Sequence, residues 1–62
     1  QGRVAVFEVK YAKTLNDMSS QCAKALKQIQ DKMYAKDYED EYEEIDCYGI
    51  SFYKKRCMIR KI

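Results

Sequence analysis

The stretch that most constrains the fold is residues 4–10, Val-Ala-Val-Phe-Glu-Val-Lys. Five of these seven residues are apolar and three are valine, which predicts an extended strand with at least one packed face. Side chains alternate between the two faces of a strand, so Glu8 and Lys10 share one face with Val4 and Val6, with about 6.5–7 Å between successive members. Because burying an unpaired charge is costly, two charged groups in an apolar run need a physical explanation.

Two explanations remain open on these residues alone. In the first, Glu8 and Lys10 form an ordinary ion pair near a strand end, which stabilises the fold by about 0–1 kcal/mol. In the second, they are half of a metal-dependent phosphodiesterase site. A glutamate oxygen is the hard ligand that divalent cations prefer, and a lysine ammonium can hold an attacking water or stabilise transition-state charge.

Length and composition limit the class of protein. Sixty-two residues make at most one domain, and so short a chain buries only about 60% of its unfolded surface. The composition is globular, and no apolar run approaches the ~20 residues of a membrane span. No signal-peptide pattern opens the chain, so we expect a cytoplasmic protein without a membrane partner. The chain begins within a strand and without an initiator methionine, which predicts a piece of a longer protein.

The cysteine and charge patterns further limit the kinds of protein that this chain can be. Cys22, Cys47 and Cys57 are odd in number and lack CxxC spacing, in a chain without histidine. This pattern argues against a zinc site or a disulfide framework and predicts reduced thiols in apolar gaps. Net charge is +4 over the first 36 residues, −7 over the next ten and +5 over the last sixteen. Such basic regions are typical either of nucleic-acid binding or of ordinary solvated surface.

The chain is expected to form one α/β domain. The predicted elements are a strand over 3–11, a helix over 17–36, an acidic loop over 37–46 and a hairpin over 47–61, within a single partial domain 1–62. The first strand and the strand after the helix should be parallel neighbours through a right-handed crossover, with an antiparallel strand added by the hairpin. The result is a partial mixed sheet in strand-helix-strand-strand order with one helix packed on it. One sheet face and one edge would stay uncovered.

Local patterns support the helix and the hairpin. The helix has one apolar stripe at helical spacing, formed by Met18, Cys22, Ala25, Leu26, Ile29 and Met33. Thr14 or Asn16 can cap its start. A two-residue hairpin turn at Lys54-Lys55 would place on one largely apolar face Tyr48, Ile50, Phe52, Cys57 and Ile59. We expect the helix to cover that face, although Lys-Lys is unfavourable in such a turn and a longer loop is the alternative.

Three segments together resemble a known nuclease family. They are Glu8-Val-Lys10 at a strand end, the helix with Ala25-Leu26-Lys27-Gln28-Ile29 and Tyr34-Ala35, and the strand Tyr48-Gly49-Ile50-Ser51-Phe52. This order resembles the PD-(D/E)xK nuclease superfamily, and most closely the bacterial subgroup found C-terminal to an AAA-ATPase-like domain. The resemblance covers nearly the whole chain. It implies a restriction-endonuclease-like core fragment whose parent protein hydrolyses nucleic-acid phosphodiester bonds with Mg²⁺.

The resemblance also implies roles for individual residues. Glu8 would be a metal ligand, Lys10 the catalytic cation, Gln28 a helical glutamine near the site and Lys13 a nucleic-acid contact. Gln30 with Tyr34 is an alternative match for the helical glutamine. The aspartate that the family carries before this strand has no counterpart, since no acidic residue precedes Glu8. We therefore expect these 62 residues alone to bind Mg²⁺ weakly and to be inactive.

A non-enzymatic function is the second hypothesis. An α/β protein-interaction module would associate through the exposed sheet edge, for example as a homodimer that completes the sheet. The partners expected under the first hypothesis are nucleic acid and an N-terminal AAA-ATPase-like domain of the parent chain.

Overall fold

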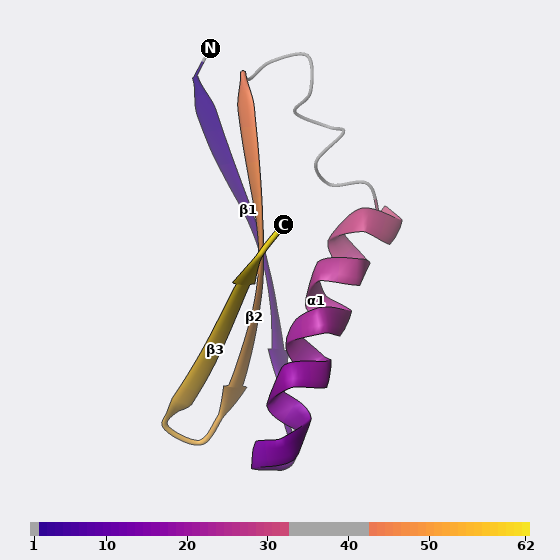
Figure 1. The fold of residues 1–62 in the computed structure, drawn as a ribbon, viewed down its shortest axis with the longest axis vertical. Helices are drawn as coiled ribbons and strands as arrows, with labels where there is room; N and C mark the ends of the chain where they lie inside the picture. The colour runs from indigo at the N-terminus through magenta and orange to yellow at the C-terminus, as the bar shows by residue number, and fades with distance from the viewer. Residues whose placement is uncertain (1, 33–42) are drawn as a thin grey trace.

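The computed structural model describes residues 2–32 and 43–62. Its elements are β1 (Arg3–Tyr11), a 3-10 helix η1 (Leu15–Asp17), α1 (Met18–Lys32), β2 (Glu44–Tyr53) and β3 (Arg56–Lys61). The strands form one sheet in the order β1-β2-β3, with β1 parallel and β3 antiparallel to β2. Figure 1 shows α1 running along one side of this sheet. The predicted α/β fold, a mixed three-stranded sheet with one helix, is confirmed.

The first strand has the predicted bounds and the predicted alternation. In β1, Val4, Val6, Glu8 and Lys10 are half-buried, whereas the residues between them are exposed. The face that carries Glu8 and Lys10 is therefore the packed face of the strand.

Most of the apolar stripe of the helix is buried as predicted, and Leu26 is half-buried. Met18, Cys22, Ala25 and Ile29 are each at most 4% exposed, while Met33 lies outside the described residues. The predicted cap at Thr14 is present, because its hydroxyl oxygen accepts a hydrogen bond from the Asp17 N–H at 3.2 Å. That cap starts η1, and the α-helix itself begins one residue later than predicted. In the part of the chain that the structure describes, no helix has both the length and the apolarity to cross a membrane.

The helix covers the opposite face of the hairpin from the one we expected. The predicted contact with the face of Tyr48, Ile50 and Phe52 is wrong. α1 instead lies on Gly49 and Ser51, both buried. A Cβ on Gly49 would lie 2.6 Å from the Cys22 carbonyl oxygen and 2.8 Å from Leu26 Cγ, so the helix backbone approaches the sheet where a side chain is missing.

Two side-chain hydrogen bonds hold this close contact between α1 and β2. The Ser51 hydroxyl donates to the Met18 carbonyl at 2.7 Å, and the Cys22 thiol donates to the Gly49 carbonyl at 3.0 Å. Both donors are fully buried. Gly49 and Ser51, which were expected on the outer face of the hairpin, therefore face the helix. The Ser51 hydroxyl and the Gly49 carbonyl both find hydrogen-bond partners there.

The second face of the sheet has no covering layer among the described residues. It carries the ring pair Phe7–Tyr48, stacked with centroids 5.0 Å apart, and the pair Tyr11–Phe52 at 6.0 Å. Phe7 is 56% exposed and Tyr11 is 79% exposed. We call this surface the bare face; its remaining apolar members are Val9, Ile50, Cys57 and Ile59. The predicted uncovered face is thus present, and it is the more apolar of the two.

The hairpin forms with the two-residue turn. Phe52 faces Cys57 and Ile50 faces Ile59, as predicted. Lys54 adopts a φ of 53°, the left-handed region that lysine visits only at a cost. Cys22 and Cys47 are buried in apolar gaps as predicted, but Cys57 is exposed, because it lies on the bare face.

The second strand begins earlier than predicted. β2 starts at Glu44, so the last three residues of the predicted acidic loop belong to the sheet, while residues 37–42 lie outside the described part of the chain. Arg3 contributes to this extension, because it pairs with Glu44 in the parallel ladder and its guanidinium also forms an ion pair with Glu44 and lies 3.5 Å from Asp46. The opposite charge on the neighbouring strand compensates for acidic residues that disfavour a strand by themselves.

Ser51→Ala should lower the free energy of unfolding by about 1 kcal/mol. The substitution removes a buried hydrogen bond and leaves the Met18 carbonyl without its side-chain donor. Urea denaturation followed by circular dichroism measures the change. Ser20→Ala is the matched control, since the exposed Ser20 hydroxyl also donates to a backbone carbonyl, that of Asp17 at 3.0 Å. Equal losses in the two variants would contradict a special contribution from Ser51.

Candidate functional site

Glu8 and Lys10 lie on the face of β1 that α1 covers. Both side chains are half-buried, and in the parallel register Glu8 faces Gly49 and Lys10 faces Ser51. These two partners are the residues on which the helix rests. The pair therefore lies at the border where the β1 edge of the sheet meets the helix, and both side chains are partly accessible to solvent.

The ordinary explanation for the two charges is not supported. Within residues 2–32 and 43–62, the ion pairs closer than 4 Å are Arg3–Glu44, Arg3–Asp46 and Lys61–Asp46. Glu8 and Lys10 pair neither with each other nor with another described residue. Glu8 and Lys10 thus lie side by side and half-buried, without a direct ion pair to each other or to another described residue.

The helical phase places Gln28 on the β1 side of α1. Ser19 marks the other side of the helix, because its hydroxyl accepts a hydrogen bond from Arg60 of β3. Gln28 follows Ser19 by nine positions, which is two and a half turns, so it projects from the opposite flank. Gln28 is half-buried, unlike the exposed Gln30, which does not lie on this flank. Of the two predicted glutamines, the structure places Gln28 on the flank of Glu8 and Lys10.

A second glutamine on the same flank was not predicted. Gln21 precedes Gln28 by seven residues, which returns to nearly the same helical direction, and it is also half-buried. Because Met18 rests on Ser51 and Cys22 on Gly49, Gln21 lies at the level of these strand residues and hence of Glu8 and Lys10. Gln21 could have been predicted from the sequence, because two glutamines seven residues apart lie on the same flank of a helix.

Lys13 lies just beyond the pair. It follows Ala12, whose N–H donates to the Phe52 carbonyl at 2.8 Å and extends the sheet by one bond. The Lys13 side chain is exposed. It is not part of the half-buried group, but it stands at the end of the sheet that Lys10 approaches.

The described residues do not form a complete metal site. Nowhere in these two segments do three or more histidine, cysteine, aspartate or glutamate side chains gather as ligands. Glu8 offers a single carboxylate, and Asp46 lies near the other end of β2, opposite Ala5. Mg²⁺ commonly takes one or two carboxylates and fills the rest of its shell with water and substrate phosphate. Glu8 fits one position of such a shell and no more.

The sequence of this chain matches one protein-family model over residues 1–62, that of the PD-(D/E)XK nuclease superfamily. The chain belongs to that superfamily. Neither a curated protein nor a solved structure gave a significant match. A PD-(D/E)XK nuclease acts on nucleic acid, and enzymes of this superfamily commonly use divalent metals. The glutamate and lysine on the packed face of β1 have the spacing that the superfamily name describes.

A separate charged cluster lies at the opposite end of this PD-(D/E)XK chain and affects stability. Lys61 Nζ lies 3.1 Å from Asp46 Oδ1. Its hydrogen bond to Asp46 raises the pKa of the Lys61 ammonium above its ordinary 10.5. Burial, and then the Asp46 carboxylate, raise the pKa of the Cys47 thiol above its ordinary 9.0. Both groups therefore hold their protons more tightly in the folded state than in the unfolded state.

The free energy of unfolding should consequently fall as the pH rises above about 9. Because the folded chain binds more protons over this range, the slope of stability against pH is negative. The stabilisation is complete below the ordinary pKa of each group and is lost as the pH passes through the raised value. Urea denaturation at neutral and alkaline pH tests this, and the double variant Cys47→Ala, Lys61→Gln should show a shallower slope. An unchanged slope would show that Cys47 and Lys61 are not the groups responsible for the pH dependence.

Proposed function

We propose that the chain is the C-terminal part of a metal-dependent nuclease that hydrolyses nucleic-acid phosphodiester bonds in the full-length protein. The observation that supports this most directly is the pair Glu8 and Lys10, half-buried on the packed face of β1 and not paired with each other. Membership of the PD-(D/E)XK superfamily supports the same reaction class.

Each residue of the site has a role that its chemistry allows. The Lys10 ammonium is a point charge that would stabilise negative charge developing on the phosphate. On the helix flank beside β1, the amide of Gln28, or that of Gln21 at the level of the pair, would donate to or accept from a water or phosphate oxygen. Glu8 would contribute one carboxylate to Mg²⁺. When bound, that ion supplies charge neutralisation and an activated water.

Two features support a longer parent protein. Among the residues that the structure describes, Glu8 is the one carboxylate at the candidate site, and the bare face leaves large apolar side chains in water. We propose that a segment before β1 supplies a second carboxylate, and that the parent is a bacterial cytoplasmic protein with an N-terminal AAA-ATPase-like domain. The isolated 62-residue chain should then bind Mg²⁺ weakly and cleave nothing.

The test is cleavage of labelled DNA and RNA by the full-length protein. We expect hydrolysis that requires Mg²⁺ and is lost with EDTA, and no hydrolysis by the isolated chain under the same conditions. Cleavage that continues in EDTA would contradict a metal-dependent reaction. Cleavage by the isolated chain would contradict the proposal that a segment before β1 supplies part of the site.

The bare face favours a second candidate function, a protein-interaction module. Phe7, Tyr11 and Ile59 on this face are between 56% and 79% exposed, and exposed apolar side chains that lie together can mark an interaction site. In this case the chain associates through its sheet, for example as a homodimer, and has no catalytic role. Sedimentation should show association that depends on these residues, with Glu8→Gln and Lys10→Gln having no effect on any activity of the parent. A stable monomer would eliminate this candidate.

A further inference from the structure

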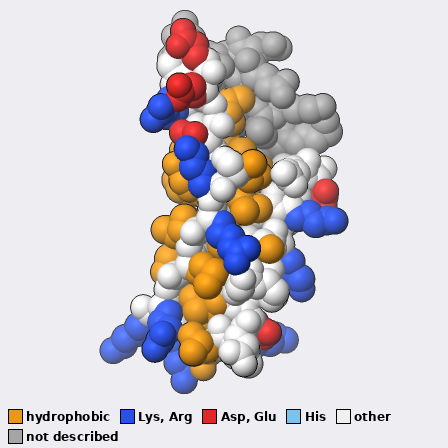
Figure 2. All heavy atoms as spheres, viewed as in Figure 1, with side chains coloured by type: hydrophobic (Ala, Val, Ile, Leu, Met, Phe, Trp, Pro, Cys, Tyr) orange, Lys and Arg blue, Asp and Glu red, His pale blue; other side chains and the backbone are white. Residues whose placement is uncertain are grey.

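The end of the molecule next to Lys10 carries a concentrated positive charge from two separate segments. We call this surface the basic end; it consists of Lys13, Lys54, Lys55 and Arg56. The hydrogen bond from the Ala12 N–H to the Phe52 carbonyl, 2.8 Å long, aligns the residue after β1 with the residues that close β2. Lys13 therefore lies beside the β2–β3 turn. Figure 2 shows blue side chains gathered at this lower end of the molecule.

The charge of the basic end is not neutralised by neighbouring carboxylates. All three ion pairs among the described residues lie at the opposite end, around Arg3, Asp46 and Lys61. No acidic residue occurs after Asp46 in the sequence, and Asp17 is the one carboxylate between residues 9 and 30. All four basic side chains are exposed. A cluster of exposed cations without counter-ions attracts a polyanion.

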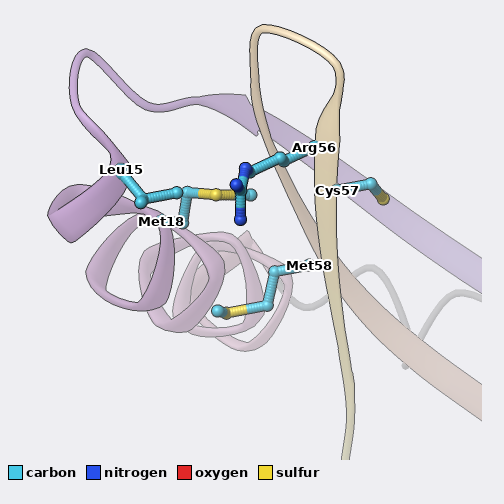
Figure 3. A pocket seen from close by; sticks show the side chains of 5 residues that line it. All are labelled: Leu15, Met18, Arg56, Cys57 and Met58. Carbon is cyan, nitrogen blue, oxygen red and sulfur yellow. The ribbon is translucent and has the colours of Figure 1, made fainter.

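Aromatic rings accompany these cations. Tyr11 is 79% exposed at the end of β1, on the bare face and not on the face of Lys10. Tyr53 is half-buried, and Lys54 Nζ lies 5.4 Å from the centre of its ring. Arg56 also lines an open hollow, together with Leu15, Met18, Cys57 and Met58. Figure 3 shows the Arg56 side chain reaching over this apolar floor from β3. An exposed ring next to several cations is typical of surfaces that hold a phosphate backbone while an unpaired base stacks on the ring.

The basic end adjoins the candidate catalytic pair. Lys10 faces Ser51 and Tyr11 faces Phe52 in the register, so the turn at Lys54 lies about three strand residues, or roughly 10 Å, beyond Lys10. Each strand of a duplex carries one phosphate per about 3.4 Å of helix axis, and an unpaired strand can be more extended. The distance thus corresponds to at most about three nucleotides beyond the phosphate at Lys10.

We propose that the basic end binds the phosphate backbone of a single-stranded nucleic acid and leads it to the Glu8–Lys10 pair. The inference deepens the proposed nuclease function and rests on it for the identity of the polyanion. Lys13, Lys54, Lys55 and Arg56 would contact phosphates, and Tyr11 would stack on a base.

The test measures binding by the 62-residue chain to a short fluorescein-labelled single-stranded oligonucleotide, by anisotropy over a range of salt concentrations. The binding variant is Lys54→Asn with Lys55→Gln, in which asparagine accommodates the positive φ of position 54. The matched control is Lys24→Gln with Lys27→Gln, which removes the same charge from exposed positions on the outer side of α1. Circular dichroism verifies that both variants are folded.

We expect the binding variant to lose affinity by about tenfold or more at ~0.1 M salt and the salt slope to fall by about 1.4, while the control changes little. Tyr11→Leu should weaken binding by about tenfold. Equal losses in the binding variant and the control would overturn the proposal. So would the absence of oligonucleotide binding, or binding only to phosphatidylserine vesicles.

The outcome separates this inference from the nuclease function. Glu43→Gln should preserve oligonucleotide affinity, because exposed Glu43 belongs neither to the basic end nor to the Glu8–Lys10 pair. One outcome is that binding depends on Lys54 and Lys55 while Glu8→Gln in the parent protein still cleaves fully. That outcome would support nucleic-acid binding by the basic end and refute the catalytic role of Glu8. If Glu8→Gln abolishes cleavage but binding does not depend on Lys54 and Lys55, the catalytic role of Glu8 is supported and nucleic-acid binding by the basic end is refuted.

Discussion

Gly49→Ala should lower the free energy of unfolding by about 3 kcal/mol or more and leave much of the chain unfolded at room temperature. The added Cβ would lie 2.6 Å from the Cys22 carbonyl oxygen, closer than such atoms pack. That oxygen belongs to the helix backbone, so no rotamer change relieves the clash and α1 must move off the sheet. Overpacking costs about 1–3 kcal/mol where side chains can adjust, and a chain this small has little stability in reserve.

Two comparisons isolate the steric cause of this loss. Gly2→Ala changes the only other glycine, where a Cβ meets nothing within 4 Å although the φ of 102° is unfavourable for alanine, so we expect a smaller loss of about 1 kcal/mol. Leu26→Ala added to Gly49→Ala should not restore stability, because the Cys22 carbonyl remains. Urea denaturation and far-UV circular dichroism measure both. A folded Gly49→Ala chain with unchanged stability would show that the helix does not rest on this residue.

Glu8→Gln and Lys10→Gln should each reduce nucleic-acid cleavage by the full-length protein at least a hundredfold. Removing one positioned group that stabilises developing charge costs about 10²–10³ in rate, and glutamine preserves much of the volume and polarity of either side chain. The loss should appear in the rate at saturating substrate, since the phosphate contacts of the basic end are intact. Single-turnover cleavage of a labelled oligonucleotide with Mg²⁺ provides the measurement.

Matched surface charges serve as controls for this pair. Glu43→Gln neutralises an exposed carboxylate at the far end of the molecule, and Lys24→Gln neutralises an exposed ammonium on the helix. Neither should alter cleavage by more than about twofold. If cleavage by the Glu8 and Lys10 variants equals that of these controls, the catalytic assignment is wrong, and a non-enzymatic role of the fold gains support.

Much of the fold could be predicted because local patterns and the global fold agree. Alternating residues in β1 predicted its face, the spacing from Met18 to Ile29 predicted the buried helix stripe, and the hairpin register followed from a turn at Lys54-Lys55. The half-buried position of Glu8 and Lys10 could also be predicted, because strand periodicity places them on the same face as two packed valines.

The orientation of the hairpin could not be predicted from apolarity alone. The face of Tyr48, Ile50 and Phe52 has the larger apolar side chains, yet α1 covers Gly49 and Ser51. The helix packs on the face that lets its backbone come closest to the sheet, because the buried hydrogen bonds of Cys22 and Ser51 form only at that short distance. Likewise, the strand character of Glu44 depended on Arg3, which lies far from it in the sequence. Such pairings exist only after the chain has folded.

The bare face has a consequence for how the isolated chain behaves when it is cooled. Contacts made by rings such as Phe7 and Tyr48 are driven near room temperature by the entropy of released water, so they weaken as the temperature falls. Clusters of this chain that form at ambient temperature should disperse near 0 °C and form again on warming, whereas assemblies held by the charged end groups would respond to salt instead.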